Sequence, residues 1–131
     1  MPGQIAKKLL AKPGQRMTVL NAPEGYLDEL GELPPGAQII AKPAGTVDFI
    51  QVFVKDKAEL ESVMPGAIKA VKLDGLFWIC YPKGSSKFKT DLNRDILREA
   101  VENYGLVGVS LVSINDVWSA LRVRPKDKVG K

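Results

Sequence analysis

A basic loop at residues 82–89 carries the residue types that best suit ligand binding. It follows an apolar stretch and lies directly before a predicted helix. Ammonium groups, hydroxyls and the backbone amides of a helix start together favour a phosphate or a carboxylate. The residues expected to bind this anion are Lys83, Gly84, Ser85, Ser86, Lys87, Lys89, Thr90 and Arg94. Because their order differs from that of a P-loop, the alternative is an exposed loop, with Arg94 and Arg98 paired to acids of the helix.

A second group of polar residues is expected beyond the carboxyl ends of parallel strands, where open α/β sheets bind ligands. The residues placed at this crevice are Asn21, Glu24, Gly25, Asp56 and Tyr81. Asn21 offers an amide and Glu24 a carboxylate, but both residue types also occur at the start of a helix. Tyr81 offers a phenol, and its alternative is a place at the rim of the core.

Composition excludes several kinds of catalysis. The chain has no His and one Cys, which excludes His bases, His-containing nucleophile pairs and His-containing zinc sites. Cys80 lies among apolar residues of a predicted central strand, so we expect a buried and unreactive thiol. Asp48 and Asp56 are too isolated in the sequence to indicate paired carboxylates. The sequence therefore predicts no catalytic residue and no metal site.

Nucleic acid is a further ligand that the basic and aromatic residues allow. An exposed Trp118 would stack a base, whereas the apolar neighbours of Trp78 favour a core position. The basic side chains available are Lys7, Lys8, Lys83, Lys87, Lys89, Arg122, Arg124 and Lys126. Binding requires them to share one face, and it would weaken steeply with salt.

The net charge of +4 is concentrated at the two ends of the 131-residue chain. Basic ends bind acidic partners or simply keep a protein in solution. We expect a single domain over residues 1–125 and a basic tail over 126–131. Lysines interrupt the first apolar stretch, no apolar run approaches the roughly 18 residues of a membrane span, and one Cys favours a reducing compartment. These features predict a cytoplasmic protein that does not bind membranes.

Strand and helix patterns alternate along the chain. Apolar runs predict strands over 17–20, 37–41, 47–54, 76–81, 107–114 and 117–123. Helices are expected over 5–11 and 25–30, after a capping box at Asp56 and Glu59, and over 92–104 after a cap at Thr90 or Asp91. We also expect a helix break at Pro65-Gly66, a turn at 73–75, and a tight turn at 115–116 before an antiparallel return. Together these elements predict a three-layer α/β domain.

The order of elements resembles a reduced class I S-adenosylmethionine-dependent methyltransferase. Residues 9–16, followed by an apolar strand, are similar to the approach to that family's first strand. Residues 70–76 are similar to the turn before its fifth strand, where Lys-Pro-Gly-Gly is usual, and a closing antiparallel hairpin is typical. The resemblance implies a Rossmann-like, mostly parallel sheet of about six strands with a C-terminal antiparallel hairpin.

The chain also resembles a family of small bacterial proteins of unknown function. The similar stretches are 21–26, 81–87, 89–94 and 118–122, and the resemblance runs from about Ile5 to Pro125. It implies the same fold and brings no activity with it.

Two departures from the methyltransferase pattern decide the expected function. Residues 21–25 hold one glycine and a proline where the family has a glycine-rich turn, and Ala41-Lys42-Pro43 replaces the acid that binds the ribose. One strand–helix unit is also missing between Ala41 and Val47. We therefore expect no cofactor and, first, a non-catalytic module that binds an anionic small molecule or a protein partner.

A minimal methyltransferase that uses Asn21, Glu24, Asp56 and Tyr81 around S-adenosylmethionine is the second expectation, and nucleic-acid binding is the third. Whether the crevice is open or filled distinguishes the first expectation from the second. An open pocket at the loop after the first strand would favour the enzyme. A crevice filled by Pro23 and Tyr26 would favour a protein partner.

Overall fold

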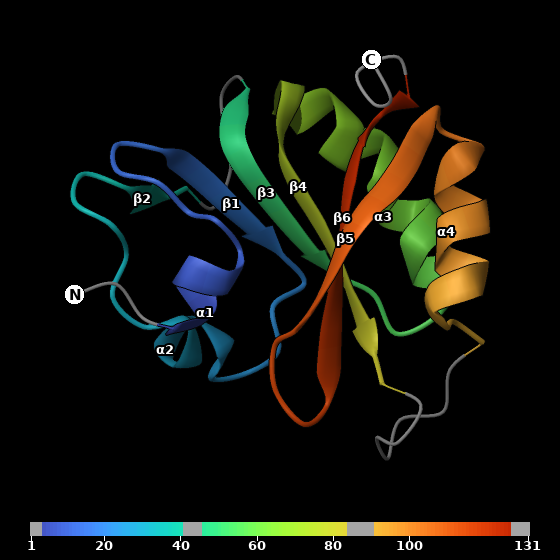
Figure 1. Ribbon diagram of the computed structural model, residues 1–131, viewed down its shortest axis with the longest axis horizontal. Coiled ribbons are helices and arrows are strands. Elements are labelled where there is room, and N and C mark those ends of the chain that lie inside the picture. The colour runs from blue at the N-terminus through green and yellow to red at the C-terminus, as the bar shows by residue number, and fades with distance from the viewer. Residues whose placement is uncertain (1–3, 41–45, 84–90, 127–131) are drawn as a thin grey trace.

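The computed structural model describes residues 4–40, 46–83 and 91–126, which form a six-stranded sheet with helices on both faces (Figure 1). The strands are β1 (Arg16–Leu20), β2 (Gln38–Ile39), β3 (Val47–Phe53), β4 (Val71–Pro82), β5 (Leu106–Ser113) and β6 (Trp118–Pro125). The helices are α1 (Gln4–Lys8), α2 (Tyr26–Leu30), α3 (Lys57–Ala70) and α4 (Arg94–Glu102).

The sheet has the strand order β2-β1-β3-β4-β6-β5. The pairs β1–β2, β1–β3 and β3–β4 are parallel, whereas β6 runs antiparallel to both of its neighbours. The tight turn before β6 is closed by Asn115, whose Oδ1 accepts hydrogen bonds from the N–H groups of Val117 and Trp118. The predicted fold is thus confirmed: a mostly parallel sheet of six strands with an antiparallel closing hairpin.

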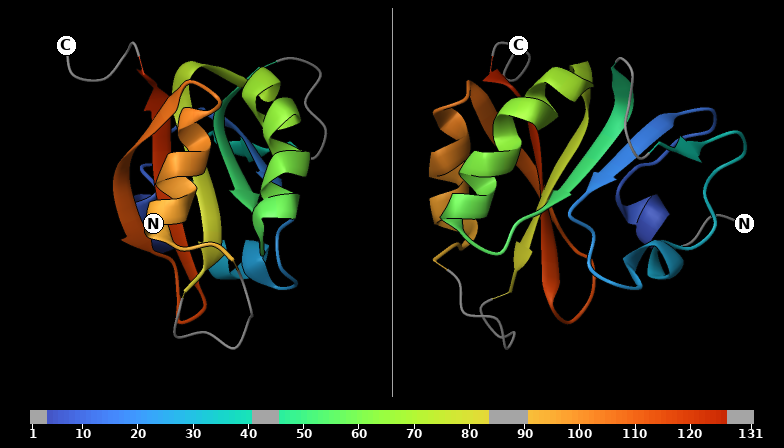
Figure 2. Two further views of the ribbon diagram at one scale, coloured as in Figure 1. Left: turned by 90° about the vertical axis from the view of Figure 1, so that its right-hand side faces the viewer. Right: turned by 180° about the vertical axis from the view of Figure 1, so that it is seen from behind.

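Each face of the sheet has its own hydrophobic cluster. α3 and α4 cover one face, where Ile50, Leu60 and Leu97 are buried, and α1 and α2 cover the other, where Phe49 and Trp78 are buried (Figure 2). Alternate residues of β3 therefore enter opposite clusters, as expected for a strand covered on both faces. No helix among the described residues is long and apolar enough to cross a membrane.

α3 is continuous, so the helix break expected at Pro65-Gly66 is wrong. Its start is as predicted, because the carboxylate of Asp56 accepts from the N–H of Glu59 at 2.9 Å. Pro65 and Gly66 both lie on the exposed side, whereas Leu60 and Met64 keep the apolar side buried. The missing N–H of proline thus weakens the helix only where the affected backbone faces water.

The turn expected at residues 73–75 is also wrong, because β4 already begins at Val71. Val47 pairs with Val71, but Phe49 pairs with Leu76, so β4 carries extra residues opposite β3. The stretch that suggested a turn is a β-bulge. Gly75 fits closely there, because an added Cβ would lie 3.0 Å from the carbonyl oxygen of Asp48.

The cap expected for α4 was also assigned to the wrong residue. Asn93 caps this helix, and its side chain accepts from the N–H of Ile96 at 2.9 Å. Asp91 instead accepts from the N–H of Lys57, the first residue of α3, at 2.9 Å. Thr90, the other predicted cap, lies outside the described residues.

Candidate functional site at the carboxyl ends of β1 and β3

A cavity of about 340 Å³ lies where β1 and β3 end. This is the edge of the sheet at which a ligand crevice was predicted. The residues around it are Asn21, Ala22, Pro23, Phe53, Lys55, Glu59 and Trp118. Pro23 therefore borders an open pocket rather than filling it.

Aromatic rings form one side of this crevice pocket. The ring of Phe53 meets that of Trp118 edge-on, with centroids 5.0 Å apart, and meets that of Tyr26 at 4.6 Å. Phe53 and Trp118 line the pocket, whereas Tyr26 is almost fully buried below it. Phe53 is 2% and Trp118 6% exposed, so the two rings give the pocket an apolar wall of which only a small part is open to a ligand.

A buried chain of hydrogen bonds holds this aromatic group in place. The hydroxyl of Tyr26 donates to Oε1 of Gln51 at 2.9 Å, and Nε2 of Gln51 contacts Sγ of Cys80 at 3.1 Å. Burial raises the pKa of Tyr26 above its usual range and that of Cys80 to about 12. Both groups are therefore neutral near pH 7, and the thiol is buried, as the sequence predicts.

One base and one acid complete the pocket. Lys55 follows the end of β3, and Glu59 lies in the first turn of α3, where its carboxylate accepts from the N–H of Lys55 at 2.7 Å. The Lys55 ammonium lies 4.0 Å from the same carboxylate, with 55% of its side chain exposed. Both charges are therefore available to a ligand, and exposed pairs of this kind are weak.

The structure brings together only part of the predicted crevice group. Asn21 lines the pocket with a left-handed backbone, φ 59°, and Gly25 precedes α2 at φ 80°. Glu24 lines an adjoining cavity of about 170 Å³ that shares Pro23 and Trp118 with the first. Asp56 does not line the pocket, because its carboxylate caps α3.

Tyr81 lies apart from the pocket, in the cluster under α3 and α4. Burial raises the pKa of its phenol, and the charges of Arg94 and Arg98 oppose that shift. Its position matches the alternative considered for it, a place at the rim of the core.

Two residues of the predicted anion loop can be placed. Nζ of Lys83 donates to Oγ of Ser113 at 2.6 Å. Nε of Arg94 lies 3.5 Å from Asp95, in an exposed pair on α4. The remaining predicted residues, Gly84, Ser85, Ser86, Lys87, Lys89 and Thr90, lie outside the described residues.

Among the described basic residues considered for nucleic acid, Lys83 and Lys126 lie at opposite ends of the strands. Lys83 lies at the carboxyl end of β4, where its N–H donates to the carbonyl of Val117. Lys126 lies at the opposite edge, where its N–H donates to the carbonyl of Gly105. Trp118 is buried, so it presents little surface to a base.

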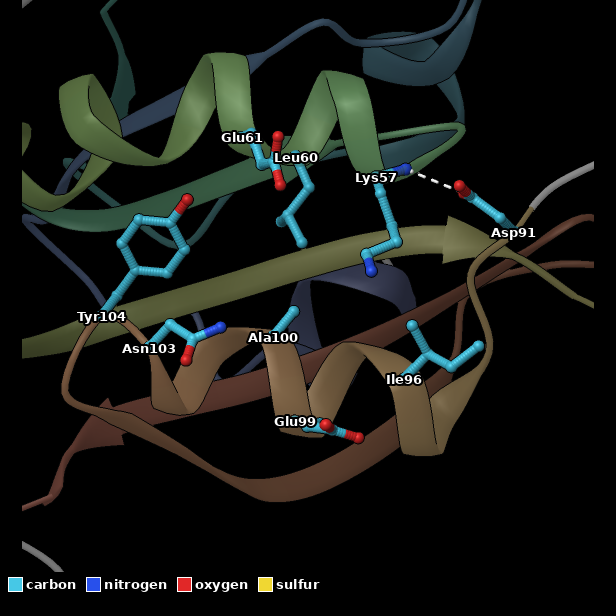
Figure 3. Close-up of a pocket in the computed structure, with 9 residues that line it drawn as sticks. All are labelled: Lys57, Leu60, Glu61, Asp91, Ile96, Glu99, Ala100, Asn103 and Tyr104. Atoms are coloured by element: carbon cyan, nitrogen blue, oxygen red, sulfur yellow. Dashed lines mark hydrogen bonds between the residues drawn. The ribbon is translucent and has the colours of Figure 1, made fainter.

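A larger cavity of about 490 Å³ separates α3 from α4 (Figure 3). Leu60, Ile96 and Ala100 give it apolar surface, and Glu61 and Glu99 give it carboxylates. It lies on the α3/α4 side and shares no residue with the crevice pocket. No group of three or more His, Cys, Asp or Glu in the described ranges is arranged to hold a metal ion.

Sequence reasoning did not single out Glu59 or Phe53 as pocket residues. The signal for both was present, since each lies three residues from Asp56, which the sequence placed at the crevice. It also missed the contact between Lys8 and Ser113, in which Nζ of Lys8 donates to the carbonyl of Ser113 at 3.1 Å. These two residues are 105 positions apart, so only the fold brings them together.

Solved structures with the same fold include methyltransferases that use S-adenosylmethionine. One from Aquifex aeolicus has a TM-score of 0.62 and 13% identity, over 92% of this chain and 87% of its own. A ribosomal protein L11 methylase from Lactobacillus delbrueckii subsp. bulgaricus has a TM-score of 0.61 and 10% identity, over 93% and 75%. The Burkholderia thailandensis 1,6-didemethyltoxoflavin-N1-methyltransferase, solved with bound S-adenosylhomocysteine, has a TM-score of 0.61 and 12% identity, over 94% and 77%.

The chain therefore has a methyltransferase-like Rossmann fold. No family model and no curated protein matches its sequence. The resemblance to a family of small bacterial proteins stays a prediction. At these identities, the likeness to solved structures establishes the fold and leaves the ligand open.

Proposed function

We propose that this protein is a methyltransferase-like module whose crevice pocket binds an S-adenosyl ligand, S-adenosylmethionine or its demethylated product. The observation that carries the proposal is the open pocket of about 340 Å³ at the loop after β1. Small-molecule sites have volumes of roughly 300–1,000 Å³ and occur at this edge of an α/β sheet. The sequence placed a non-catalytic module first and a minimal methyltransferase second, and an open pocket at this loop was to favour the methyltransferase. We therefore rank binding of an S-adenosyl ligand first.

The chemistry of the lining residues suits such a ligand. An S-adenosyl amino acid carries a planar base, a carboxylate and an ammonium group. The rings of Phe53 and Trp118 would support the apolar part, Lys55 the carboxylate, and Glu59 the ammonium group. Asn21 adds an amide at the end of β1, with its backbone already in the left-handed region.

The proposal does not include a catalytic residue. Pro23 has no N–H to offer a ligand, and Asp56 and Tyr81 lie outside the pocket. What the chain's residues would do is bind and orient the ligand. When S-adenosylmethionine is bound, the chemistry it supplies is an electrophilic methyl group, and transfer of that group can rely on positioning alone.

Calorimetric titration with S-adenosylhomocysteine at low salt and near neutral pH tests the proposal. We expect a dissociation constant of about 100 μM or tighter, which is about −5.5 kcal/mol. Asn21→Gly keeps the backbone conformation and removes the amide, and Glu59→Gln keeps the hydrogen-bond acceptor and removes the charge. Each should weaken binding several-fold, whereas the control Glu61→Gln, at a residue of α3 that lines the separate cavity beside α4, should not. Absence of heat and of thermal stabilisation for the unmutated protein would exclude an S-adenosyl ligand.

A non-catalytic module that binds an anionic small molecule or a protein partner is the second candidate. Lys8 and Lys83 favour the anion, because both ammonium groups donate to Ser113 beside the crevice. A thermal-shift screen with phosphates and carboxylates tests it. Stabilisation by an anion without any effect of S-adenosylhomocysteine would favour this candidate over the first.

A further inference from the structure

We propose that Lys8, Lys83 and Ser113 form a binding site for the phosphate group of a small molecule, next to the crevice pocket. Two ammonium groups from distant parts of the chain converge on one residue. Nζ of Lys83 donates to Oγ of Ser113 at 2.6 Å, and Nζ of Lys8 donates to its carbonyl oxygen at 3.1 Å. Both lysines therefore end within hydrogen-bond distance of a single residue at the end of β5.

The site is fixed by four elements that meet at one edge of the sheet. Lys8 ends α1, Ser113 ends β5, and Lys83 follows β4. Figure 1 shows the hairpin of β5 and β6 turning at the lower edge, where β4 also ends. The N–H of Lys83 donates to the carbonyl of Val117 at 2.7 Å, so the backbone at the base of this side chain is tied to the hairpin.

No carboxylate of the described chain neutralises these two ammonium groups. The nearby acid on α2, Glu29, accepts from Nδ2 of Asn115 at 2.6 Å instead. Ser113 is uncharged, so it satisfies hydrogen bonds without balancing charge. Like charges repel, and a doubly charged anion that contacts both ammonium groups would relieve this repulsion.

The position of the site indicates where the rest of the phosphate-bearing molecule would lie. Asn115, two residues after Ser113, lines the cavity of about 170 Å³ together with Glu24 and Trp118. That cavity adjoins the crevice pocket. The inference rests on the proposed function in one respect, because it assigns the phosphate to a second molecule held beside the crevice ligand.

Titration with pyrophosphate at low salt, followed by calorimetry, tests the site. We expect binding by the unmutated protein, at least tenfold weaker binding by Lys8→Gln and by Lys83→Gln, and a change below twofold for Lys7→Gln. Lys7 is the matched control, since it precedes Lys8 on α1 and is exposed like it. The thermal midpoint of each variant shows that it is folded. Equal binding by all four proteins, or no binding by the unmutated one, would overturn the proposal.

Two further titrations distinguish this phosphate site from the crevice pocket and from a nucleic-acid site. S-adenosylhomocysteine should bind Lys8→Gln and Lys83→Gln as it binds the unmutated protein. Loss of pyrophosphate binding alone then supports the site, whatever the fate of the crevice proposal. A single-stranded oligonucleotide that binds where pyrophosphate does not, with steep dependence on salt, would overturn the small-molecule site in favour of nucleic acid.

Discussion

The carboxylate of Asp91 accepts a hydrogen bond from the backbone N–H of Lys57 at 2.9 Å, although the two residues are 34 positions apart. Lys57 is the first residue of α3, so Asp91 caps a helix to which it does not belong (Figure 3). With Asp56 on the N–H of Glu59, two carboxylates satisfy the start of α3 and complement its dipole. This contact joins the segment before α4 to α3, the helix that borders the crevice.

Replacing Asp91 by Ala should lower the free energy of unfolding by about 1 kcal/mol, as expected for loss of an N-terminal cap. Urea unfolding followed by circular dichroism measures this change. Asp95→Ala is the matched control, because the Asp95 side chain is 85% exposed and pairs only on the surface. It should change stability by less than about 0.5 kcal/mol. Equal effects of the two variants would contradict the capping role of Asp91.

The buried hydrogen bond between Tyr26 and Gln51 should be revealed by coupling between mutations. Tyr26→Phe leaves Oε1 of Gln51 without a donor, and Gln51→Leu leaves the hydroxyl of Tyr26 without an acceptor. Each should cost about 1–3 kcal/mol, the penalty for a buried unsatisfied group. The double variant should cost clearly less than the sum, and urea unfolding of all four proteins measures the difference. Additive effects would show that the bond contributes nothing of its own.

Stability should fall in acid partly through Asp48. Its hydrogen bond from the Lys72 ammonium, and then that from the N–H of Arg16, hold its pKa below the usual value. The pKa of Asp48 is thus lower in the folded protein than in the unfolded chain, where it is near 3.9. The stability that this difference contributes is fully present above the unfolded pKa and is lost as the pH falls through the folded pKa. Thermal midpoints between pH 2 and pH 6 should therefore fall less steeply for Asp48→Asn. A control at an exposed acid, Asp28→Asn, should keep the slope of the unmutated protein.

Two glycines should respond in opposite directions to replacement by Ala. An added Cβ at Gly66 meets nothing within 4 Å outside its own helix, so Gly66→Ala should stabilise by about 0.5–1 kcal/mol. At Gly75 the same atom would lie 3.0 Å from the carbonyl oxygen of Asp48, so Gly75→Ala should destabilise by about 1–3 kcal/mol. Urea unfolding of both variants checks the signs, and a stabilised Gly75→Ala would show that the bulge yields easily.

The strands could be predicted because their apolar runs are local signals. The buried run at 47–54 forms β3, and the turn residues at 115–116 lie between β5 and β6. The edge at which a pocket would lie also followed from the alternation of strands and helices. These predictions depend only on residues that are close together in the sequence.

The errors arose where a local signal competes with tertiary structure. Pro65 and Gly66 usually end a helix, but α3 continues because its buried side is unaffected and only exposed backbone is lost. Asp91 has the residue type of a cap for α4, yet it caps α3. Pairs such as Lys8 and Ser113 lie beyond any local pattern, so only the three-dimensional structure could reveal them.

The separation of the core into two clusters has a consequence for spectroscopy. Both tryptophans of the chain, Trp78 and Trp118, belong to the cluster under α1 and α2, and the cluster under α3 and α4 has none. Tryptophan emission therefore reports on one side of the sheet, whereas the far-ultraviolet signal reports on both. Agreement of the two signals during denaturation would mean that the layers unfold together, and divergence would show that one layer opens first.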